Sequence, residues 1–143
     1  MKLKEIMTRE VEVIHPDDSV QAAAQKMRTR DVGLLPVCVG DRLVGVLSDR
    51  DITLRATAEG LDPKTTPVRA LMTSAVVCCF EDQSADEAAR LMKDNRIRRL
   101  VILNRGDVCL VGIVSLGDLA TNVGDDKLPG RVLQSVSTRN FER

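Results

Sequence analysis

The sequence has almost no aromatic or histidine side chains. Its 143 residues include no Trp or Tyr, and the aromatic residues are Phe80 and Phe141. Proteins that bind single-stranded nucleic acid stack the bases on aromatic rings, so this class of function is effectively excluded. The single histidine, His15, precedes a proline in an expected turn. The sequence therefore lacks the histidine ligands that a histidine-based metal site needs.

Net charge and long apolar runs are also absent. Lys and Arg together number 21, as do Asp and Glu, so the formal net charge is +0. No net field attracts nucleic acid or an anionic membrane, although a local basic cluster could bind a small anion. No apolar run approaches the roughly 20 residues that span a bilayer, and the charged start lacks the apolar core of a secretory signal. We expect a cytoplasmic protein with no nucleic-acid or membrane partner.

The cysteines form no recognisable metal or redox motif. None lies in a C-x-x-C pair, and the neighbours Cys78 and Cys79 would point to opposite faces of a strand. Each cysteine lies in or beside an apolar run, where a free thiol behaves as a small hydrophobic side chain. Buried thiols are therefore favoured over a metal or redox site. The four residues are Cys38, Cys78, Cys79 and Cys109.

What the sequence does contain is a repeated seven-residue pattern. Gly45–Asp51 reads GVLSDRD, and 67 residues later Gly112–Asp118 reads GIVSLGD. Both copies fit G-h-h-S-x-x-D, where h is an apolar residue. Each copy predicts a strand that ends where a helix begins, with the serine as the helix N-cap.

The residues before the first copy complete a predicted β-α-β-β-α unit. A helix from Ser19 to about Arg30 follows from apolar residues at positions i, i+3, i+4 and i+7. A turn at Gly40-Asp41 predicts a hairpin. The strands expected in this unit span residues 11–14, 35–39 and 43–47, and the last helix runs from Ser48 to near Gly60.

The same order of patterns returns in the second half of the chain. Met72-Thr73 matches Met7-Thr8, and equating Leu100–Leu103 with Pro36–Val39 makes the second hairpin loop three residues longer. Matching positions across two whole units establish an internal repeat. We expect a first repeat at 1–60, a linker at 61–67, a second repeat at 68–124 and a tail at 125–143. The tail is expected to be a flexible joint, one docked turn of helix and a frayed end.

Two such units, each opening with Met-Thr and closing with G-h-h-S-x-x-D, resemble a tandem pair of cystathionine-β-synthase (CBS) domains, or Bateman module. The resemblance covers about residues 4–123 and is similar to small stand-alone bacterial CBS proteins of the hypoxic or stress-response type. It implies a mixed α/β fold of the α+β type, in which two β-α-β-β-α repeats pack with pseudo-twofold symmetry. It also implies two clefts that hold adenosine ligands such as AMP, ADP, ATP, S-adenosylmethionine or a dinucleotide.

In that family the closing Asp binds the ribose hydroxyls and the Ser contacts phosphate or ribose, which implies ligand-binding roles for Asp51 with Ser48 and Asp118 with Ser115. A carboxylate can accept two hydrogen bonds from a vicinal diol, and glycine at the strand end would let a ligand approach the backbone. The alternative is that Ser-x-x-Asp only caps a helix. Capping would be preserved by duplication as readily as binding.

The resemblance further implies that the two clefts differ. Arg98 and Arg99 would reach the phosphates of a ligand held by Asp51, whereas the Asp118 cleft would face Leu34 and Leu35. One cleft would then suit a phosphate, and the other a less charged ligand or none. A solvated basic patch that pairs with Glu81 or Asp94 is the alternative for these arginines.

The sequence contains no catalytic constellation: a P-loop, a nucleophile elbow and a histidine base are all missing. Asp49, Asp51, Asp125 and Asp126 match no calcium loop. Two functions remain: a sensor of an adenine nucleotide that signals to an unknown partner, or an interaction scaffold without a ligand. The family commonly forms homodimers, and small residues on the helices would permit close packing, although core packing explains them equally. These residues are Ala22, Ala23, Ala24, Ala88 and Ala89.

Overall fold

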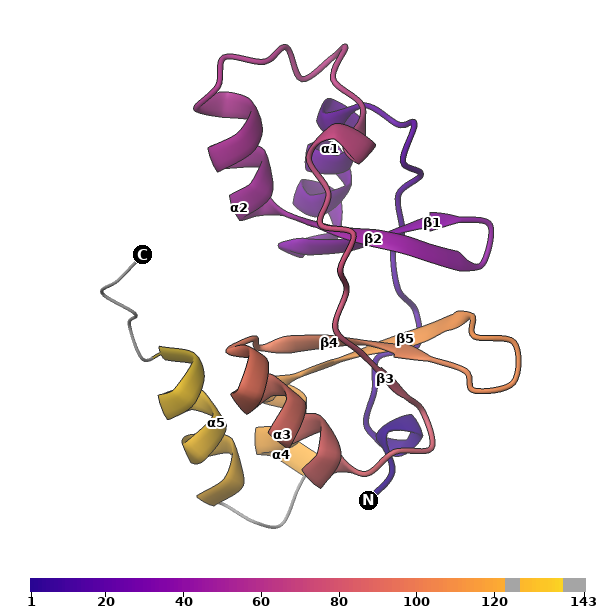
Figure 1. Cartoon of the computed structure of the whole chain (residues 1–143), viewed down its shortest axis with the longest axis vertical. Coiled ribbons are helices and arrows are strands. Elements are labelled where there is room, and N and C mark those ends of the chain that lie inside the picture. Colours follow the sequence, from indigo (N-terminus) through magenta and orange to yellow (C-terminus); the bar gives the residue numbers. More distant parts are fainter. Residues whose placement is uncertain (123–126, 138–143) are drawn as a thin grey trace. The chain divides into compact units, whose positions relative to one another are not determined.

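The computed structural model describes residues 1–122 and 127–137 of the chain. The chain forms two compact units (Figure 1). Unit A is Val11–Val76, and unit B combines Met1–Glu10 with Val77–Arg143. Each unit contains strands covered by helices, which confirms the mixed α/β class. Asp125, Asp126 and Phe141 lie outside the described residues.

Unit A is built on a two-stranded antiparallel hairpin, β1–β2. The predicted α1 helix begins after Ser19, whose Oγ accepts a hydrogen bond from the Ala22 N–H at 3.0 Å, and this confirms the expected N-cap. The helix α2 continues directly into a π-helical stretch, η2. The elements of unit A are α1 (Val20–Arg30), β1 (Leu34–Val39), β2 (Arg42–Ser48), α2 (Asp49–Asp51), η2 (Ile52–Thr57) and η3 (Val68–Ala70).

Unit B contains a three-stranded sheet in the order β3-β4-β5, with β3 parallel and β5 antiparallel to β4. Helices α3 and α4 repeat the places of α1 and α2 in the order of elements, and α5 has no counterpart in unit A. The elements are η1 (Leu3–Glu5), β3 (Cys78–Phe80), α3 (Ala85–Asn95), β4 (Arg99–Leu103), β5 (Leu110–Ser115), α4 (Leu116–Asn122) and α5 (Lys127–Ser137).

Each unit has its own hydrophobic core, and each core takes residues from the start of the other sequence repeat. Leu3 and Met7 are buried in the core of unit B. Val68 and Leu71 are buried in the core of unit A. The sequence repeat and the compact unit are therefore not the same set of residues.

The Met-Thr dipeptides extend the two sheets. Thr8 pairs with Ile113 of β5 through two backbone hydrogen bonds of 2.8 and 3.0 Å. In unit A, Thr73 pairs in the same way with Val46 of β2, at 2.9 and 3.0 Å. Each antiparallel bridge satisfies backbone groups of a strand that would otherwise lie at the sheet edge.

Three sequence expectations need correction here. The strand expected at 11–14 is reduced to one bridge, Ile14 with Val37. The C-terminal segment forms α5, an 11-residue helix that packs on α3 and α4, where one docked turn was expected. Pro129 and Gly130 suggested a break, but proline is tolerated in the first turn of a helix.

The third correction concerns the register between the repeats. Leu35 pairs with Leu47 and Leu100 with Val114, and a bulge follows Val37 in one sheet and Ile102 in the other. Leu100 therefore matches Leu35 and not Pro36, so the expected alignment was wrong by one residue. The hairpin connection spans residues 39–42 between Cys38 and Leu43, and residues 104–109 between Leu103 and Leu110. Four residues are thus replaced by six, a difference of two and not three.

Candidate functional site

The first Ser-x-x-Asp sequence forms a reciprocal helix cap. The Asp51 N–H donates to Ser48 Oγ at 3.1 Å, and the Ser48 N–H donates to Asp51 Oδ2 at 2.9 Å. This capping box satisfies two backbone donors at the start of α2, which would otherwise lack partners. The Asp51 side chain is 17% exposed, and its Oδ1 lies 3.9 Å from Nε of Arg55 on the next turn.

The second copy repeats this geometry closely. The Asp118 N–H donates to Ser115 Oγ at 3.0 Å, and the Ser115 N–H donates to Asp118 Oδ2 at 2.8 Å. Asp118 Oδ1 has no hydrogen bond or ion pair among residues 1–122 and 127–137. The capping interpretation is therefore confirmed for both copies. In each copy the cap uses one carboxylate oxygen, so the second oxygen can accept a bond from a ligand hydroxyl.

The glycines that lead the two patterns serve a different purpose from the one expected. A Cβ atom on Gly112 would lie 2.7 Å from Met7 Sδ and 2.8 Å from the Thr8 carbonyl oxygen. A Cβ on Gly45 would lie 2.9 Å from the equivalent atoms of Met72 and Thr73. The absent side chain makes room for the Met-Thr backbone bridge. Close approach of a ligand is not needed to explain it.

Arg98 directly precedes strand β4, Arg99 is the first residue of β4, and both line a surface cavity of about 450 Å³ within unit B. Both side chains are exposed. Neither forms an ion pair with Glu81, Asp94 or any other acid among the described residues. The charge of the two guanidinium groups is therefore uncompensated within that part of the chain. The other lining residues are Leu116, Gly117, Ala120, Gly130 and Leu133.

The equivalent place in unit A has opposite chemistry. The Leu116 N–H donates to the Arg98 carbonyl, and the Asp49 N–H donates to the Gly33 carbonyl, so Gly33 matches Arg98. The Asp49 carboxylate lies close over Gly33, because a Cβ there would be 2.9 Å from Asp49 Oδ2. Leu34 then matches Arg99. Leu35 is buried in the core of unit A and cannot face a cleft, which corrects the earlier expectation.

Sequence reasoning missed the part of this cavity that α5 contributes, namely Gly130 and Leu133. A signal was present, because Val132, Leu133 and Val136 have the spacing of an apolar helix face. Val132 is only 1% exposed and joins the core of unit B. The helix is thus held by burial of its own apolar side chains.

The described residues gather no cluster of three His, Cys, Asp or Glu side chains that could hold a metal ion. None of the four cysteines, all of which lie in the described ranges, forms a disulfide. Cys38 and Cys79 are buried, whereas Cys78 and Cys109 are only partly buried, so the prediction of buried thiols is confirmed for two of the four. Burial, with smaller contributions from Cys78 and Glu87, raises the pKa of Cys79 to about 11. This thiol is therefore protonated and unreactive at neutral pH. No helix in the described ranges is long and apolar enough to cross a bilayer.

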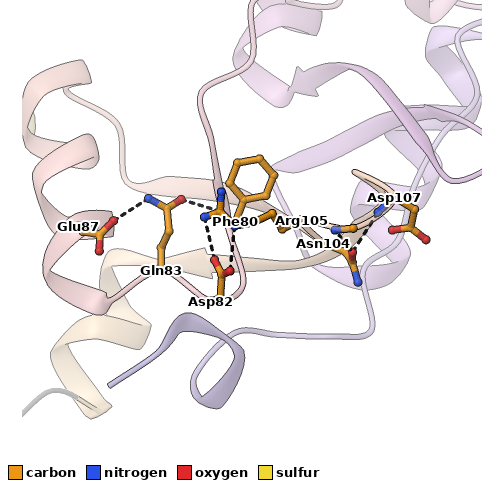
Figure 2. A network of polar contacts seen from close by, with 8 residues as sticks. Phe80, Asp82, Gln83, Glu87, Asn104, Arg105 and Asp107 are labelled. Carbon is orange, nitrogen blue, oxygen red and sulfur yellow. Dashed lines mark hydrogen bonds and ion pairs between the residues drawn. The ribbon is translucent and has the colours of Figure 1, made fainter.

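A charged network at the longer hairpin loop of unit B is structural. Arg105 donates two hydrogen bonds of 2.9 Å to the Asp82 carboxylate, and its guanidinium lies 4.3 Å from the centre of the Phe80 ring (Figure 2). Gln83 accepts from the Phe80 N–H and donates to Glu87. The network ties the β4–β5 loop to the turn before α3.

This network predicts a pH effect on stability. The hydrogen bonds from Arg105 lower the pKa of the Asp82 carboxyl below its ordinary value. A lowered folded pKa stabilises the fold above the unfolded value of roughly 4, and this stabilisation is lost as the pH falls through the folded pKa. The melting temperature of the natural protein should therefore exceed that of Asp82→Asn at pH 6. The gap should close below about pH 4.

Thermal melts of both proteins from pH 7 to pH 2.5 measure this gap. The pKa of Glu87 is also lowered, chiefly by its hydrogen bond from Gln83, but that effect is common to both proteins and cancels. A gap that stays constant across the range would show that the Asp82 carboxylate makes no pH-dependent contribution. The effect should be modest, because the pair is exposed.

Comparison with known proteins agrees with the repeat and the fold. The family model of the CBS domain matches residues 3–56 and again residues 68–125. The chain is 40% identical over 139 residues to the CBS domain-containing protein YhcV of Bacillus subtilis, covering 97% of each. It is 35% identical over 121 residues to hypoxic response protein 1 of Mycobacterium tuberculosis, covering 84% of this chain and 83% of that protein.

A solved structure supports the same relationship. The crystal structure of Hypoxic Response Protein I with two coordinated zinc ions aligns with a TM-score of 0.79 at 34% identity, covering 86% of this chain and 99% of that one. Both the sequence and the fold of this chain therefore match those of small proteins made of two CBS domains. The chain belongs to the CBS-domain family, as a tandem pair of CBS domains.

Proposed function

We propose that the chain is a cytoplasmic regulatory protein that binds an adenosine-containing nucleotide and passes its bound state to a partner protein. CBS-pair proteins are generally regulatory and ligand-binding. The candidate ligands are AMP, ADP, ATP, S-adenosylmethionine and NAD(H). The observation that carries the proposal is the repeated pair of half-buried carboxylates, Asp51 and Asp118, each held by a capping box that uses only one of its two oxygens.

The capping box favours binding rather than competing with it. The cap fixes Asp51 Oδ2 on the Ser48 N–H, so the orientation of the carboxylate is set before a ligand arrives. A preorganised acceptor loses less side-chain entropy when it binds. A vicinal diol could then donate to Oδ1 and share Oδ2, with charge-assisted hydrogen bonds. Ser48 is already committed to the Asp51 N–H, so we assign it a positioning role.

We assign the phosphate contacts to Arg98 and Arg99. Their charge is uncompensated among the described residues, and a guanidinium matches a phosphate with two parallel hydrogen bonds. Asp51 belongs to unit A and these arginines to unit B. The role of Asp51 and the role of the two arginines are therefore each tested by their own variants. The Asp118 carboxylate would serve a second, less charged site.

The regulatory role is preferred over catalysis because small stand-alone CBS proteins are typically regulatory. We further propose a homodimer, as the exposed small residue Ala24 on α1 would permit close helix packing. The alternative function is a ligand-free interaction scaffold. The two functions differ in one measurable property, which is stabilisation by a nucleotide.

The test is a thermal-shift titration with AMP, ADP, ATP, S-adenosylmethionine and NADH. A ligand at 100 times its dissociation constant should add about 2.7 kcal/mol to the free energy of unfolding. Asp51→Asn should weaken binding roughly tenfold, because it removes the charge that strengthens the diol contact. This variant keeps one side-chain oxygen for the Ser48 N–H, so the cap survives and a general loss of stability is avoided.

Asp49→Asn is the matched control. Asp49 lies on the same helix, and its Oδ1 already accepts from the Arg50 N–H at 2.8 Å. Its replacement should leave nucleotide affinity unchanged. No stabilisation by any of the five compounds would favour the scaffold. Unchanged binding after joint replacement of Arg98 and Arg99 by alanine would overturn their phosphate role.

A further inference from the structure

The cavity in unit B is closed on one side by the helix that unit A lacks. Gly130 and Leu133 of α5 form one wall, and Leu116, Gly117 and Ala120 of α4 form another. The two arginines at the start of β4 complete it. A volume of about 450 Å³ falls in the range of small-molecule sites.

The lining has two distinct chemical parts. One part is the pair Arg98 and Arg99, exposed and without a carboxylate partner in the described ranges. The other part is apolar, made of Leu116, Ala120 and Leu133. Such a surface suits a ligand with an anionic group at one end and an apolar body at the other.

Helix α5 is held in place by two different contacts. Val132 is buried, and Val136 packs against the same core, which includes Ala89 of α3. Near the end of α5, Ser137 Oγ accepts a hydrogen bond of 3.3 Å from Arg98 Nη2. Arg98 therefore contacts the helix and the cavity at once.

The residues around this cavity differ from the matching residues of unit A. Ala89 of α3 is 1% exposed, whereas Ala24, the matching residue of α1, is exposed. The places of Arg98 and Leu116 are taken in unit A by Gly33 and Asp49, whose carboxylate covers that glycine. Unit B therefore differs from unit A at these positions and in having α5 beside the cavity.

We propose that this cavity binds a phosphate monoester that carries an apolar or aromatic group, and that its binding is coupled to docking of α5. The phosphate bonds to Arg98 and Arg99, and the apolar group covers Leu133 and Ala120. Because α5 supplies part of the contact surface, the ligand binds the docked state more tightly than the undocked state. By linkage it must then stabilise the docked helix.

The contact between Arg98 and Ser137 does not reverse the expected stabilisation of docked α5 by the ligand. A 3.3 Å hydrogen bond from the guanidinium to a neutral hydroxyl is weaker than a shorter one to an anionic phosphate oxygen, so Arg98 can turn toward the ligand at little cost to α5. The burial of Val132 keeps the helix attached meanwhile. Docking of α5 would thus report whether the cavity is occupied.

This inference shares with the proposed function only the phosphate-binding role of Arg98 and Arg99. It uses neither Asp51 nor Asp118, so a ligand without a ribose diol separates the two. Phenyl phosphate is the probe, because it has a phosphate and an aromatic body and no vicinal hydroxyls. Inorganic phosphate tests the anion alone, and ADP tests the nucleotide.

The experiment is amide hydrogen exchange of the full chain, read over residues 130–137, together with a binding titration. At ten times its dissociation constant, phenyl phosphate should slow exchange in α5 about tenfold, since exchange proceeds through the undocked state. Inorganic phosphate should bind more weakly and slow exchange less. Joint replacement of Arg98 and Arg99 by alanine should weaken phenyl phosphate binding at least tenfold.

Leu133→Ser should weaken binding of phenyl phosphate roughly fivefold while inorganic phosphate binding is unchanged. Leu54→Ser is its matched control, because both leucines are 48% exposed and Leu54 lies in unit A. Arg28→Ala with Arg90→Ala controls for loss of two positive charges on exposed helix positions. Both control proteins should bind as the natural chain does.

Absence of saturable phenyl phosphate binding would overturn the inference, as would binding that leaves α5 exchange unchanged or faster. The proposed function fails separately. If phenyl phosphate binds and protects α5 while no nucleotide binds in a manner that depends on Asp51, the cavity stands and the nucleotide proposal falls. If ADP binding depends on Asp51 but neither compound protects α5, the reverse holds.

Discussion

Replacement of Leu3 by alanine is expected to lower the free energy of unfolding of unit B by about 2–5 kcal/mol. Leu3 belongs to the first sequence repeat, yet it is fully buried in the core of unit B beside Met92, Leu100 and Leu119. Truncation removes its contacts with these side chains and leaves a cavity, which is why the cost exceeds that of transfer alone. A loss of this size is a large share of the stability of a small domain.

The matched change is Val68→Ala, at the corresponding place at the start of the second repeat. Val68 is fully buried in the core of unit A. Native-state hydrogen exchange should show that Leu3→Ala weakens protection in α3 and β5, while Val68→Ala weakens protection in α1 and β2. Loss of protection in α1 after Leu3→Ala, with α3 unaffected, would contradict the division into units.

This division has a consequence for how the chain can be cut. A break in the linker at 61–67 separates each sequence repeat from the segment that completes its sheet and core, since Thr8 pairs with Ile113 and Thr73 with Val46. Unit A is continuous, from Val11 to Val76, and holds its own core. The first residues of each sequence repeat therefore belong to the unit formed mainly by the other repeat. The stability of each unit depends on residues that lie on both sides of the linker.

The order of elements could be predicted from the sequence because the signals are local. Apolar spacing placed α1 within one residue of its ends, and the serine caps at 19, 48 and 115 are present as expected. The alignment of the two repeats at strands β1 and β4 could not be predicted in this way. Residues 35–38 and 100–103 are uniformly apolar and buried, so they lack the alternation that marks the faces of a strand.

In the candidate site too, the local features could be predicted from the sequence and the long-range contacts could not. The Ser-x-x-Asp sequences predicted the capping boxes, because a cap involves residues three apart. The role of Gly45 depends on Met72, which lies 27 residues further along the chain, and the role of Gly112 depends on Met7, which lies 105 residues before it. The cavity wall depends on where α5 docks. Such long-range contacts leave no periodic trace at the residues they constrain.

Gly112→Ala is expected to cost unit B about 3 kcal/mol, at the upper end of the usual range for overpacking. The new Cβ would lie 2.8 Å from the Thr8 carbonyl oxygen and 2.7 Å from Met7 Sδ. The methionine side chain can move, but the carbonyl belongs to a backbone bridge whose hydrogen bonds to Ile113 measure 2.8 and 3.0 Å. Relief of the contact therefore breaks that bridge and shifts Met7 out of the core.

Gly117→Ala is the control, since its Cβ would meet only Ser115 Oγ at 3.5 Å, an ordinary contact. Alanine is also the better helix former at this position of α4, so the variant should be as stable as the natural chain or slightly more so. Urea unfolding of both variants measures the difference. A Gly112→Ala protein as stable as the control would mean that the Met7-Thr8 bridge adds little to unit B. The loss predicted for Leu3→Ala would then have to come from Leu3 packing alone, so the two variants together separate the contribution of the bridge from that of the core.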